Sequence, residues 1–317
     1  MKKFLVKIGI ALGLVVLVHG VTVLLFANGK IDVFYLRFTT PRKHSLVLGN
    51  SRAAQGIVPD VVDESLEDQN FQGPLFNYGF TLSTSPYGPF YLASVKKKLD
   101  PTTQRGLFIL SVDPWSISRE TALKTDDTTQ YIDGRGFPYN MHFVNSNPNL
   151  EFLVKNYDKG WGDMILANTV RTVQSELHPN GWLEITIPMI KDRHEQRIRD
   201  KVELYRKQNF YAKTFSSIRL AYLKKTILYL KHYGQVYLVR IPLDERLAEV
   251  EKEYLPEFDQ LMEDCASELS VPYLNYFADN TLYQTTDGNH LYKESSKLFS
   301  KKLAQDIRNH INLQKGK

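Results

Sequence analysis

The sequence predicts an α/β fold, a three-layer sandwich with a central parallel five-stranded sheet, plus one N-terminal transmembrane helix and an inserted cap. Two observations predict the sheet. Short apolar runs alternate with helical segments that are long enough to connect parallel strands. One run, GLFILSV at 106–112, is apolar throughout, as expected for a strand that is buried on both faces.

The first element is an apolar run at residues 4–27. About 20 apolar residues span a bilayer core. The basic residues that precede and enter the run are Lys2, Lys3 and Lys7. They favour a cytoplasmic amino end, so we interpret 1–30 as a retained signal anchor, with 31–317 outside the cytoplasm. A cleaved signal peptide is one alternative, although the run is long and lacks an Ala-x-Ala site. A buried core helix is the other.

The charge distribution argues against a nucleic-acid partner. The chain has 40 Lys and Arg against 35 Asp and Glu, a net charge of +5. Four of the basic residues and no acidic residue lie in 1–30, which leaves 31–317 with a net charge of +1. Binding to nucleic acid requires a basic face, so we expect none. The single cysteine, Cys265, excludes an intrachain disulfide and a multi-cysteine metal site.

The body is expected to hold five strands and four helices, interrupted by one insertion. The strands are predicted at 44–48, 75–77, 106–112, 235–241 and 271–276, and the helices at 86–99, 213–233, 245–269 and 293–312. Residues 116–212 are too long for a simple connection. We expect them to form a cap over the carboxyl edge of the sheet, where open α/β sheets bind ligands. Within the cap, 192–208 is predicted to be a charged helix exposed to solvent.

A serine follows the first predicted strand in the motif LVLGNSR, residues 46–52. Gly49 allows a tight turn, and Ser51 then lies at the carboxyl end of the strand, beside the start of a helix. The Ser51 N–H can point into the same space as its hydroxyl and so provide one oxyanion donor. By itself, a serine in this position is more typical of a helix N-cap.

An Asp-x-x-His motif precedes the last predicted helix, in TDGNHL at 286–291. His290 is a usable base for a serine hydroxyl. Asp287 can accept from the imidazole across a glycine turn and fix its tautomer. By itself the motif is more typical of a surface turn. Taken together, Ser51, Asp287 and His290 supply a nucleophile, a base and an orienting group.

The order of these motifs resembles the SGNH/GDSL hydrolase superfamily. Residues 49–51 match its Gly-Asp-Ser-like first block, 77–79 match its second block, and 287–290 match its last block. The resemblance covers about 44–112 and 235–312. It implies an SGNH/flavodoxin-like fold and a serine hydrolase with Ser51, Asp287 and His290 as catalytic residues. It also implies an oxyanion hole formed by the backbone N–H groups of Ser51 and Gly79.

The third block departs from the family. The family usually has Gly-x-Asn-Asp there, and its Asn donates to the oxyanion, whereas this chain has SVDPW at 111–115. An ionised Asp113 can only accept, so another group donates, Asp113 has a different role, or the site is impaired. The candidate substrate-binding residues are Arg52, Asn77, Asp113 and Trp115. Arg52 would bind an anionic group or pair on the surface, and Trp115 would stack on a sugar or pack in the interior.

A signal anchor joined to such a body resembles the envelope-modifying branch of the superfamily, the DltD-type teichoic acid proteins and the alginate O-acetylation proteins. The resemblance implies a single-pass cell-membrane protein with an extracytoplasmic C-terminal domain. Its function would be that of a serine esterase or O-acyltransferase acting on an acylated envelope polysaccharide or teichoic-acid-like substrate, beside a membrane-bound O-acyltransferase. The alternative is a catalytically impaired envelope protein that serves as a binding or assembly partner. We expect no cofactor and no metal, since no nucleotide-binding glycine motif or metal-ligand spacing is present.

Overall fold

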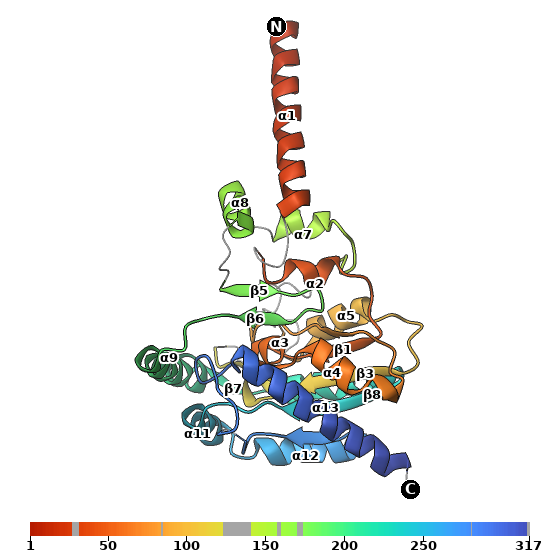
Figure 1. Ribbon diagram of the computed structural model, residues 1–317, viewed down its shortest axis with the longest axis vertical. Helices are drawn as coiled ribbons and strands as arrows, with labels where there is room; N and C mark the ends of the chain where they lie inside the picture. The colour runs from red at the N-terminus through yellow and green to blue at the C-terminus, as the bar shows by residue number, and fades with distance from the viewer. Residues whose placement is uncertain are drawn as a thin grey trace.

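A parallel sheet of five strands forms the centre of the body, and helix α1 projects away from it (Figure 1). The computed structural model describes residues 1–26, 32–83, 85–122, 141–156, 160–169, 174–279 and 281–315. In spatial order the strands are β2 (Leu75–Asn77), β1 (Ser45–Leu48), β3 (Gly106–Ser111), β8 (Gly234–Arg240) and β9 (Tyr273–Asn275). Every neighbouring pair is parallel. The predicted α/β class and its five-stranded parallel sheet are confirmed.

The strand order places a topological switch point between β1 and β3. The chain passes from β1 outward to β2, then returns past β1 to β3, and continues to β8 and β9. In doubly wound sheets with this order, ligands bind beyond the carboxyl ends of the strands at the switch point. Ser51 comes three residues after the end of β1 and Asp113 two residues after the end of β3, so both lie at this edge.

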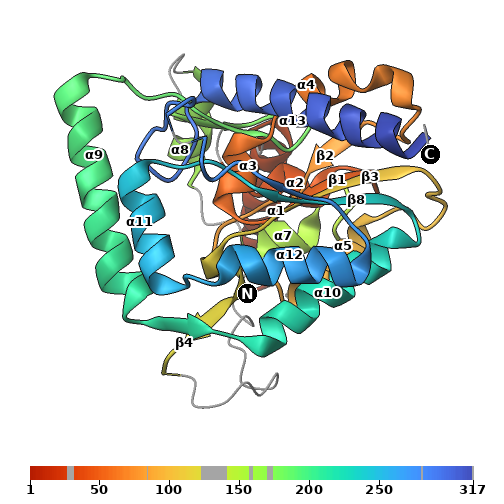
Figure 2. The ribbon, with the colours of Figure 1, turned by 90° about the horizontal axis from the view of Figure 1, so that it is seen from below.

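Helices cover both faces of the sheet (Figure 2). One face is covered by α2 (Tyr35–Thr39), α5 (Pro89–Lys98), α10 (Ser217–Lys231) and α12 (Phe258–Leu269). The other is covered by α3 (Ser51–Gly56), α4 (Pro59–Ser65), which η1 (Glu67–Gln69) follows, and α13 (Lys293–Lys315). Successive side chains of a strand point to opposite faces. In β1, Leu46 and Leu48 therefore join the first core, and Val47 joins the second.

Two predicted helices are divided in the structure. The segment predicted as a helix at 213–233 begins with β7 (Lys213–Phe215), which pairs with β4 (Ser118–Glu120), and α10 begins after it. The segment predicted at 245–269 is split into α11 (Glu245–Tyr254) and α12. The break falls at the residue before Pro256, where helical backbone geometry is disfavoured.

The segment between β3 and α10 holds short helices and two antiparallel ribbons. Its elements are η2 (Pro114–Ile117), β4, α7 (Leu150–Lys155), α8 (Trp161–Thr169), β5 (Ser175–Leu177), β6 (Leu183–Ile185), α9 (Lys191–Leu204), the π-helical η5 (Tyr205–Phe210) and β7. Residues 123–140, 157–159 and 170–173 of the expected cap lie outside the described residues. The β5–β6 ribbon lies against the body, where the Trp182 indole donates to the carbonyl of Gln55 in α3 at 2.8 Å.

Helix α1 (Lys2–Phe26) is long and apolar enough to cross a membrane. Its 25 residues rise about 37 Å, which exceeds the thickness of a hydrocarbon core. The most apolar stretch has a mean hydropathy of 2.5, and only 6% of it is buried in the protein. The last residues of the expected anchor, 27–30, lie outside the described residues.

Candidate active site

Asn50, and not Ser51, caps the helix that follows β1. The Asn50 side-chain oxygen accepts a hydrogen bond from the Arg52 N–H at 3.0 Å, and Ser51 is the first residue of α3. Gly49 makes the preceding turn with φ = 139°, and a Cβ there would lie 2.8 Å from the Ser111 Cβ. Because Asn50 does the capping, the Ser51 hydroxyl is not used for it.

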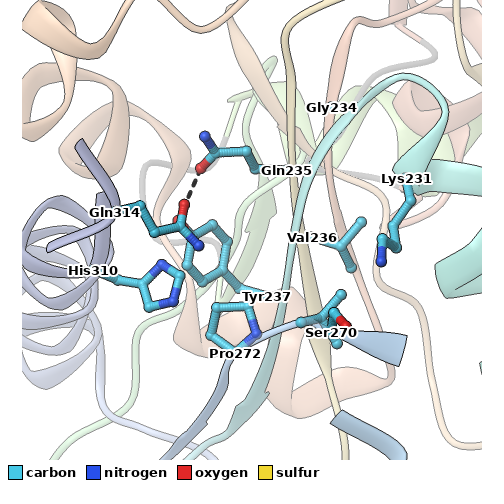
Figure 3. A pocket seen from close by; sticks show the side chains of 10 residues that line it. Lys231, Gly234, Gln235, Val236, Tyr237, Ser270, Pro272, His310 and Gln314 are labelled. Carbon is cyan, nitrogen blue, oxygen red and sulfur yellow. Dashed lines mark hydrogen bonds between the residues drawn. The ribbon is translucent and has the colours of Figure 1, made fainter. Parts of the chain in front are cut away.

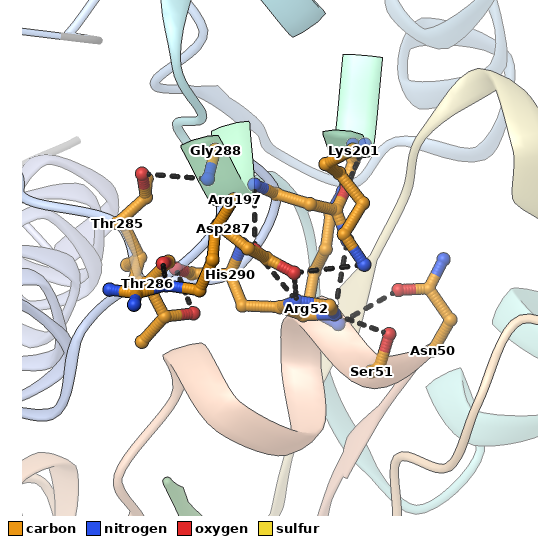
Figure 4. Close-up of polar contacts among 12 residues, drawn as sticks. Asn50, Ser51, Arg52, Arg197, Lys201, Thr285, Thr286, Asp287, Gly288 and His290 are labelled. Carbon is orange, nitrogen blue, oxygen red and sulfur yellow. Dashed lines mark hydrogen bonds and ion pairs between the residues drawn. The ribbon is translucent and has the colours of Figure 1, made fainter. Parts of the chain in front are cut away.

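The Ser51 hydroxyl lies 2.8 Å from Nε2 of His290, although 239 residues separate the two in sequence (Figure 4). His290 Nδ1 lies 3.0 Å from each carboxylate oxygen of Asp287. The structure therefore brings the three residues Ser51, Asp287 and His290 into one hydrogen-bonded chain.

The Asp287 carboxylate fixes the direction of both hydrogen bonds. An ionised carboxylate can only accept, so Nδ1 of His290 carries the proton, and this N–H donates a hydrogen bond to Asp287. In the neutral ring Nε2 then has the lone pair and accepts from the Ser51 O–H. This is the arrangement in which an imidazole can take the proton of a serine.

A tight turn holds Asp287 in place. Its Oδ1 accepts from the backbone N–H groups of Asn289 and His290, both at 3.0 Å. The Thr286 N–H donates to the His290 carbonyl at 2.8 Å and closes the turn. Gly288 has φ = 85°, a left-handed conformation that side chains other than glycine rarely adopt.

Helix α9 supplies a cation to the same carboxylate. Lys201 Nζ lies 2.9 Å from Asp287 Oδ2. Burial raises the pKa of Asp287, but His290, and after it Lys201, outweigh burial and hold this pKa far below its usual value. Asp287 therefore stays ionised. The segment 192–208 was predicted to be a helix exposed to solvent, but its residue Lys201 contacts Asp287 in the candidate site. Sequence reasoning missed Lys201 because nothing in its local sequence distinguishes it from the other charged residues of this helix.

Arg52 was expected either to bind an anionic group of the substrate or to form an ion pair on the surface, but it is buried. It is 3% exposed, and its guanidinium lies 2.6 Å from Glu251 Oε1. Its Nε and a terminal nitrogen also donate to the Asn289 side-chain oxygen at 2.9 and 2.7 Å. Burial lowers the pKa of Arg52, whereas Glu251 and then Asp113 raise it by more. Arg52 is a buried structural cation and presents no surface to a substrate.

Asn289 was not singled out from the sequence, yet it contacts the base. Arg52 fixes its orientation, because the oxygen must face the guanidinium donors. The Asn289 amide nitrogen is therefore the atom that lies 3.0 Å from Nε2 of His290. Two donors, this amide and the Ser51 hydroxyl, thus face the same ring nitrogen.

The remaining candidate substrate-binding residues are also buried. Asp113 accepts from the Asn50 amide at 2.6 Å and from the Ser116 N–H at 2.9 Å, and burial raises its pKa. It caps η2 and holds Asn50, so its role is structural. Trp115 is 1% exposed and stacks on Tyr254 with ring centroids 4.3 Å apart, which places it in the interior and not on a sugar-binding surface.

Asn77 ties the end of β2 to α3. It is fully buried, and its amide donates to the carbonyls of Ala53 and Ile57 at 2.8 and 2.9 Å. Its oxygen accepts from the Gly79 N–H at 3.1 Å. The Gly79 N–H expected in the oxyanion hole is therefore already bonded, whereas the Ser51 N–H has no acceptor within the part of the chain that the structure describes.

A pocket of about 170 Å³ lies elsewhere in the fold (Figure 3). Its lining includes Gly234 and Tyr237 of β8 and His310 of α13. Gly234 is the first residue of β8, so the pocket lies at the amino edge of the sheet, opposite Ser51. It is not part of the candidate site. No group of three or more His, Cys, Asp or Glu residues that could hold a metal ion occurs among the described residues.

No family model and no curated protein matches the sequence. Among solved structures, the inhibitor-bound aryl esterase of M. Smegmatis is 12% identical, with a TM-score of 0.35, and the match covers 84% of this chain and 99% of that chain. A second crystal structure is 9% identical, with a TM-score of 0.33, and covers 84% and 98%. Likenesses this low carry no argument about function, which therefore depends on the contacts described above.

Proposed function

We propose that this chain is a serine esterase or acyltransferase in which Ser51 is the nucleophile, His290 the base and Asp287 the group that orients His290. The observation that carries the proposal is the 2.8 Å contact from the Ser51 hydroxyl to His290 Nε2, with Asp287 on Nδ1 of the same ring. Each atom has the hydrogen-bonding role that acyl transfer requires.

The reaction follows from these contacts. Ser51 Oγ attacks an ester carbonyl while His290 Nε2 takes the hydroxyl proton, and the ester carbonyl oxygen gains the negative charge. The intermediate collapses, the alcohol leaves with the proton from His290, and an acyl group remains on Ser51. In the second half, water or a hydroxyl group attacks the acyl carbonyl while His290 removes its proton. The bond from the acyl group to Ser51 Oγ then breaks, and His290 returns the proton to Ser51, which restores the starting state.

The oxyanion is expected to be poorly stabilised. The Ser51 N–H is in position beside the hydroxyl, but the Gly79 N–H bonds to Asn77 and Asp113 replaces a donor by an acceptor. Loss of one oxyanion donor typically costs about 100- to 1000-fold in rate. We therefore propose a slow enzyme.

Fluorophosphonate labelling of the purified full-length protein tests the nucleophile. We expect labelling of the native protein and its loss in Ser51→Ala and His290→Ala. Ser217→Ala is a matched control, since Ser217 is also the first residue of a helix but is exposed, and its helix, α10, covers the face of the sheet opposite α3. Native protein that fails to label at neutral pH, or labelling that survives in Ser51→Ala, would contradict the proposal.

We further propose where the protein lies in the cell and which class of substrate it acts on. The length and apolarity of α1 support a membrane anchor, and the three lysines at its start support an extracytoplasmic body. The substrate would then be an acylated polysaccharide or teichoic-acid-like polymer of the envelope, and a membrane-bound O-acyltransferase would be the partner. Resistance to carbonate extraction and digestion by protease added to intact cells are the expected results. Recovery of the chain in the cytosol would refute this placement.

A catalytically impaired envelope protein is the second candidate function. The specific observation in its favour is that Asn77 occupies the Gly79 N–H while Asp113 offers no donor. Such a protein would use the same fold for binding or assembly with a membrane acyltransferase. The labelling experiment separates the two candidates, because a binding protein would not react covalently at Ser51.

A further inference from the structure

One face of α9 contacts the turn that carries Asp287, residue by residue. His194 Nε2 lies 2.7 Å from the Thr285 carbonyl oxygen, and Arg197 Nε donates to the Thr286 carbonyl at 2.9 Å. Lys201 then reaches Asp287. Residues 194, 197 and 201 are three and four positions apart, so they lie on one side of the helix.

The same face also packs against the turn. Ile198 is 1% exposed, and its Cγ2 would lie 3.0 Å from a Cβ built on Gly288. Four successive turn residues, 285–288, therefore face α9. Figure 4 shows Arg197 and Lys201 beside Thr286 and Asp287 at the amino end of α3.

The contacts differ in what they can do for the reaction. Those of His194 and Arg197 go to backbone carbonyls and fix the path of the turn. The contact of Lys201 goes to the oxygen that His290 also reaches, so it determines where Asp287 Oδ2 lies. Among the described residues, the groups with charge or a titratable proton whose interaction with Asp287 stands out are His290 of its own turn, Lys201 of α9 and Tyr205 of η5.

We propose that Lys201 is a positioning residue, which holds Asp287 so that Asp287 can orient His290. The inference rests on the function proposed above and adds an element from the inserted segment to it. Lys201 contacts Asp287 and neither Ser51 nor His290 in the structure, so its positioning effect passes through Asp287. Its charge also offsets that of the carboxylate and so lowers the attraction between Asp287 and a protonated His290.

Lys201→Met and Lys201→Gln test this role in the full-length protein with p-nitrophenyl acetate as the substrate. We expect kcat to fall about 10- to 100-fold, because the loss of orientation at Asp287 outweighs the stronger attraction between Asp287 and protonated His290. KM should change less than about twofold, because the lost contact orients the base and does not bind the substrate. The acid limb of kcat/KM should move to higher pH, since the loss of a nearby cation favours the protonated imidazole. Lys201→Arg should restore both values. Lys191→Met is the control, an exposed lysine on the same helix.

A proton signal gives a readout that needs no turnover. The low-field NMR resonance of the His290 Nδ1–H, assigned by its loss in His290→Gln, should shift in Lys201→Met and return in Lys201→Arg. If Lys201→Met keeps the kcat, the acid limb and the resonance of Lys191→Met, the positioning role is wrong. If native turnover does not depend on Ser51, the proposed function fails instead, and the resonance alone decides whether Lys201 positions Asp287.

Discussion

Asn50 caps helix α3, whereas its neighbour Ser51 contacts the imidazole of His290. The Asn50 oxygen accepts from the Arg52 N–H and caps α3, while the Ser51 hydroxyl lies 2.8 Å from His290. A serine after a strand is more often a helix cap than a nucleophile. Here Asn50 is the cap, so the Ser51 hydroxyl does not serve in that role. The Asn50 amide is held in turn by Asp113 at 2.6 Å.

Asn50→Ala should therefore reduce both stability and activity. Removing the cap costs about 1 kcal/mol, and the buried Asp113 loses a donor, which costs about 1–3 kcal/mol more. Activity per folded molecule should fall at least about 10-fold, because Ser51 is no longer held in place. Ser216→Ala removes the cap of α10, where the serine oxygen accepts from the Arg219 N–H at 3.3 Å. It should cost stability alone, and equal specific activities in the two variants would refute the role of Asn50.

Gly49→Ala tests the turn between β1 and Ser51. The new Cβ would lie 2.8 Å from the Ser111 Cβ and would adopt φ = 139°. Strain and overpacking together should lower the free energy of unfolding by about 2–4 kcal/mol. Gly162→Ala in α8 is the matched control, since a Cβ there meets nothing within 4 Å. Urea denaturation of the two variants gives the comparison, and a Gly49 variant as stable as the Gly162 variant would contradict the packing.

Asp287→Asn tests the orienting carboxylate through rate and through pH. An amide at this position can donate to Nδ1 and select the wrong tautomer, so kcat should fall about 10³- to 10⁴-fold. The pKa of Asp287 is lowered in the folded state, by His290 and Lys201 against the effect of burial. A lowered pKa stabilises the fold above the unfolded pKa of about 3.9, and this stability is lost as pH falls through the folded value.

The stability difference between native protein and Asp287→Asn should therefore be present from about pH 5 upward and shrink below about pH 4. Urea denaturation across this range measures it. A difference that does not change with pH would show that the carboxylate gains no ionic stabilisation from its neighbours.

Arg52→Met tests the interpretation of Arg52 as a structural cation. Glu251, which is 1% exposed, would keep Arg240, at 3.1 Å, as its one ion-pair partner among the described residues. Breaking a buried pair from one side costs about 3–5 kcal/mol. Arg246→Met breaks two pairs, with Asp244 and Glu195, in which the arginine is 40% exposed. Exposed pairs contribute little, so this variant should lose no more than about 1–2 kcal/mol. Similar losses in both variants, measured by chemical denaturation, would contradict the burial of Arg52.

Local patterns predicted the sheet and brought the three site residues to attention. The strands are short apolar runs, and the turn before His290 begins with an Asp whose oxygen accepts from the N–H two residues later. The same signal, a side chain bonding to the backbone two residues on, could have revealed that Asn77 occupies the Gly79 N–H and that Asn50 caps α3. Pro256 could likewise have shown the break between α11 and α12.

Contacts between distant parts of the chain could not be predicted in this way. In sequence, Lys201 and Arg52 cannot be told apart from the exposed basic residues of a charged helix or a helix start, although Arg52 is buried in the structure. Their roles arise because the fold places Lys201 against Asp287 and Arg52 against Glu251. No periodicity or spacing in one sequence indicates a contact of this kind. Arg52 was therefore predicted as a candidate substrate-binding residue, and the segment that forms α9 was predicted as a helix exposed to solvent.

A covalent acyl group on Ser51 is the most direct consequence of the account. The measurement is peptide mapping by mass spectrometry after acid quenching of the full-length protein during turnover of p-nitrophenyl acetate. We expect one acetyl group on the peptide that contains Ser51, absent in Ser51→Ala and reduced in His290→Ala. Turnover that continues in Ser51→Ala, or an acetyl group that occurs only on other residues, would contradict the central claim.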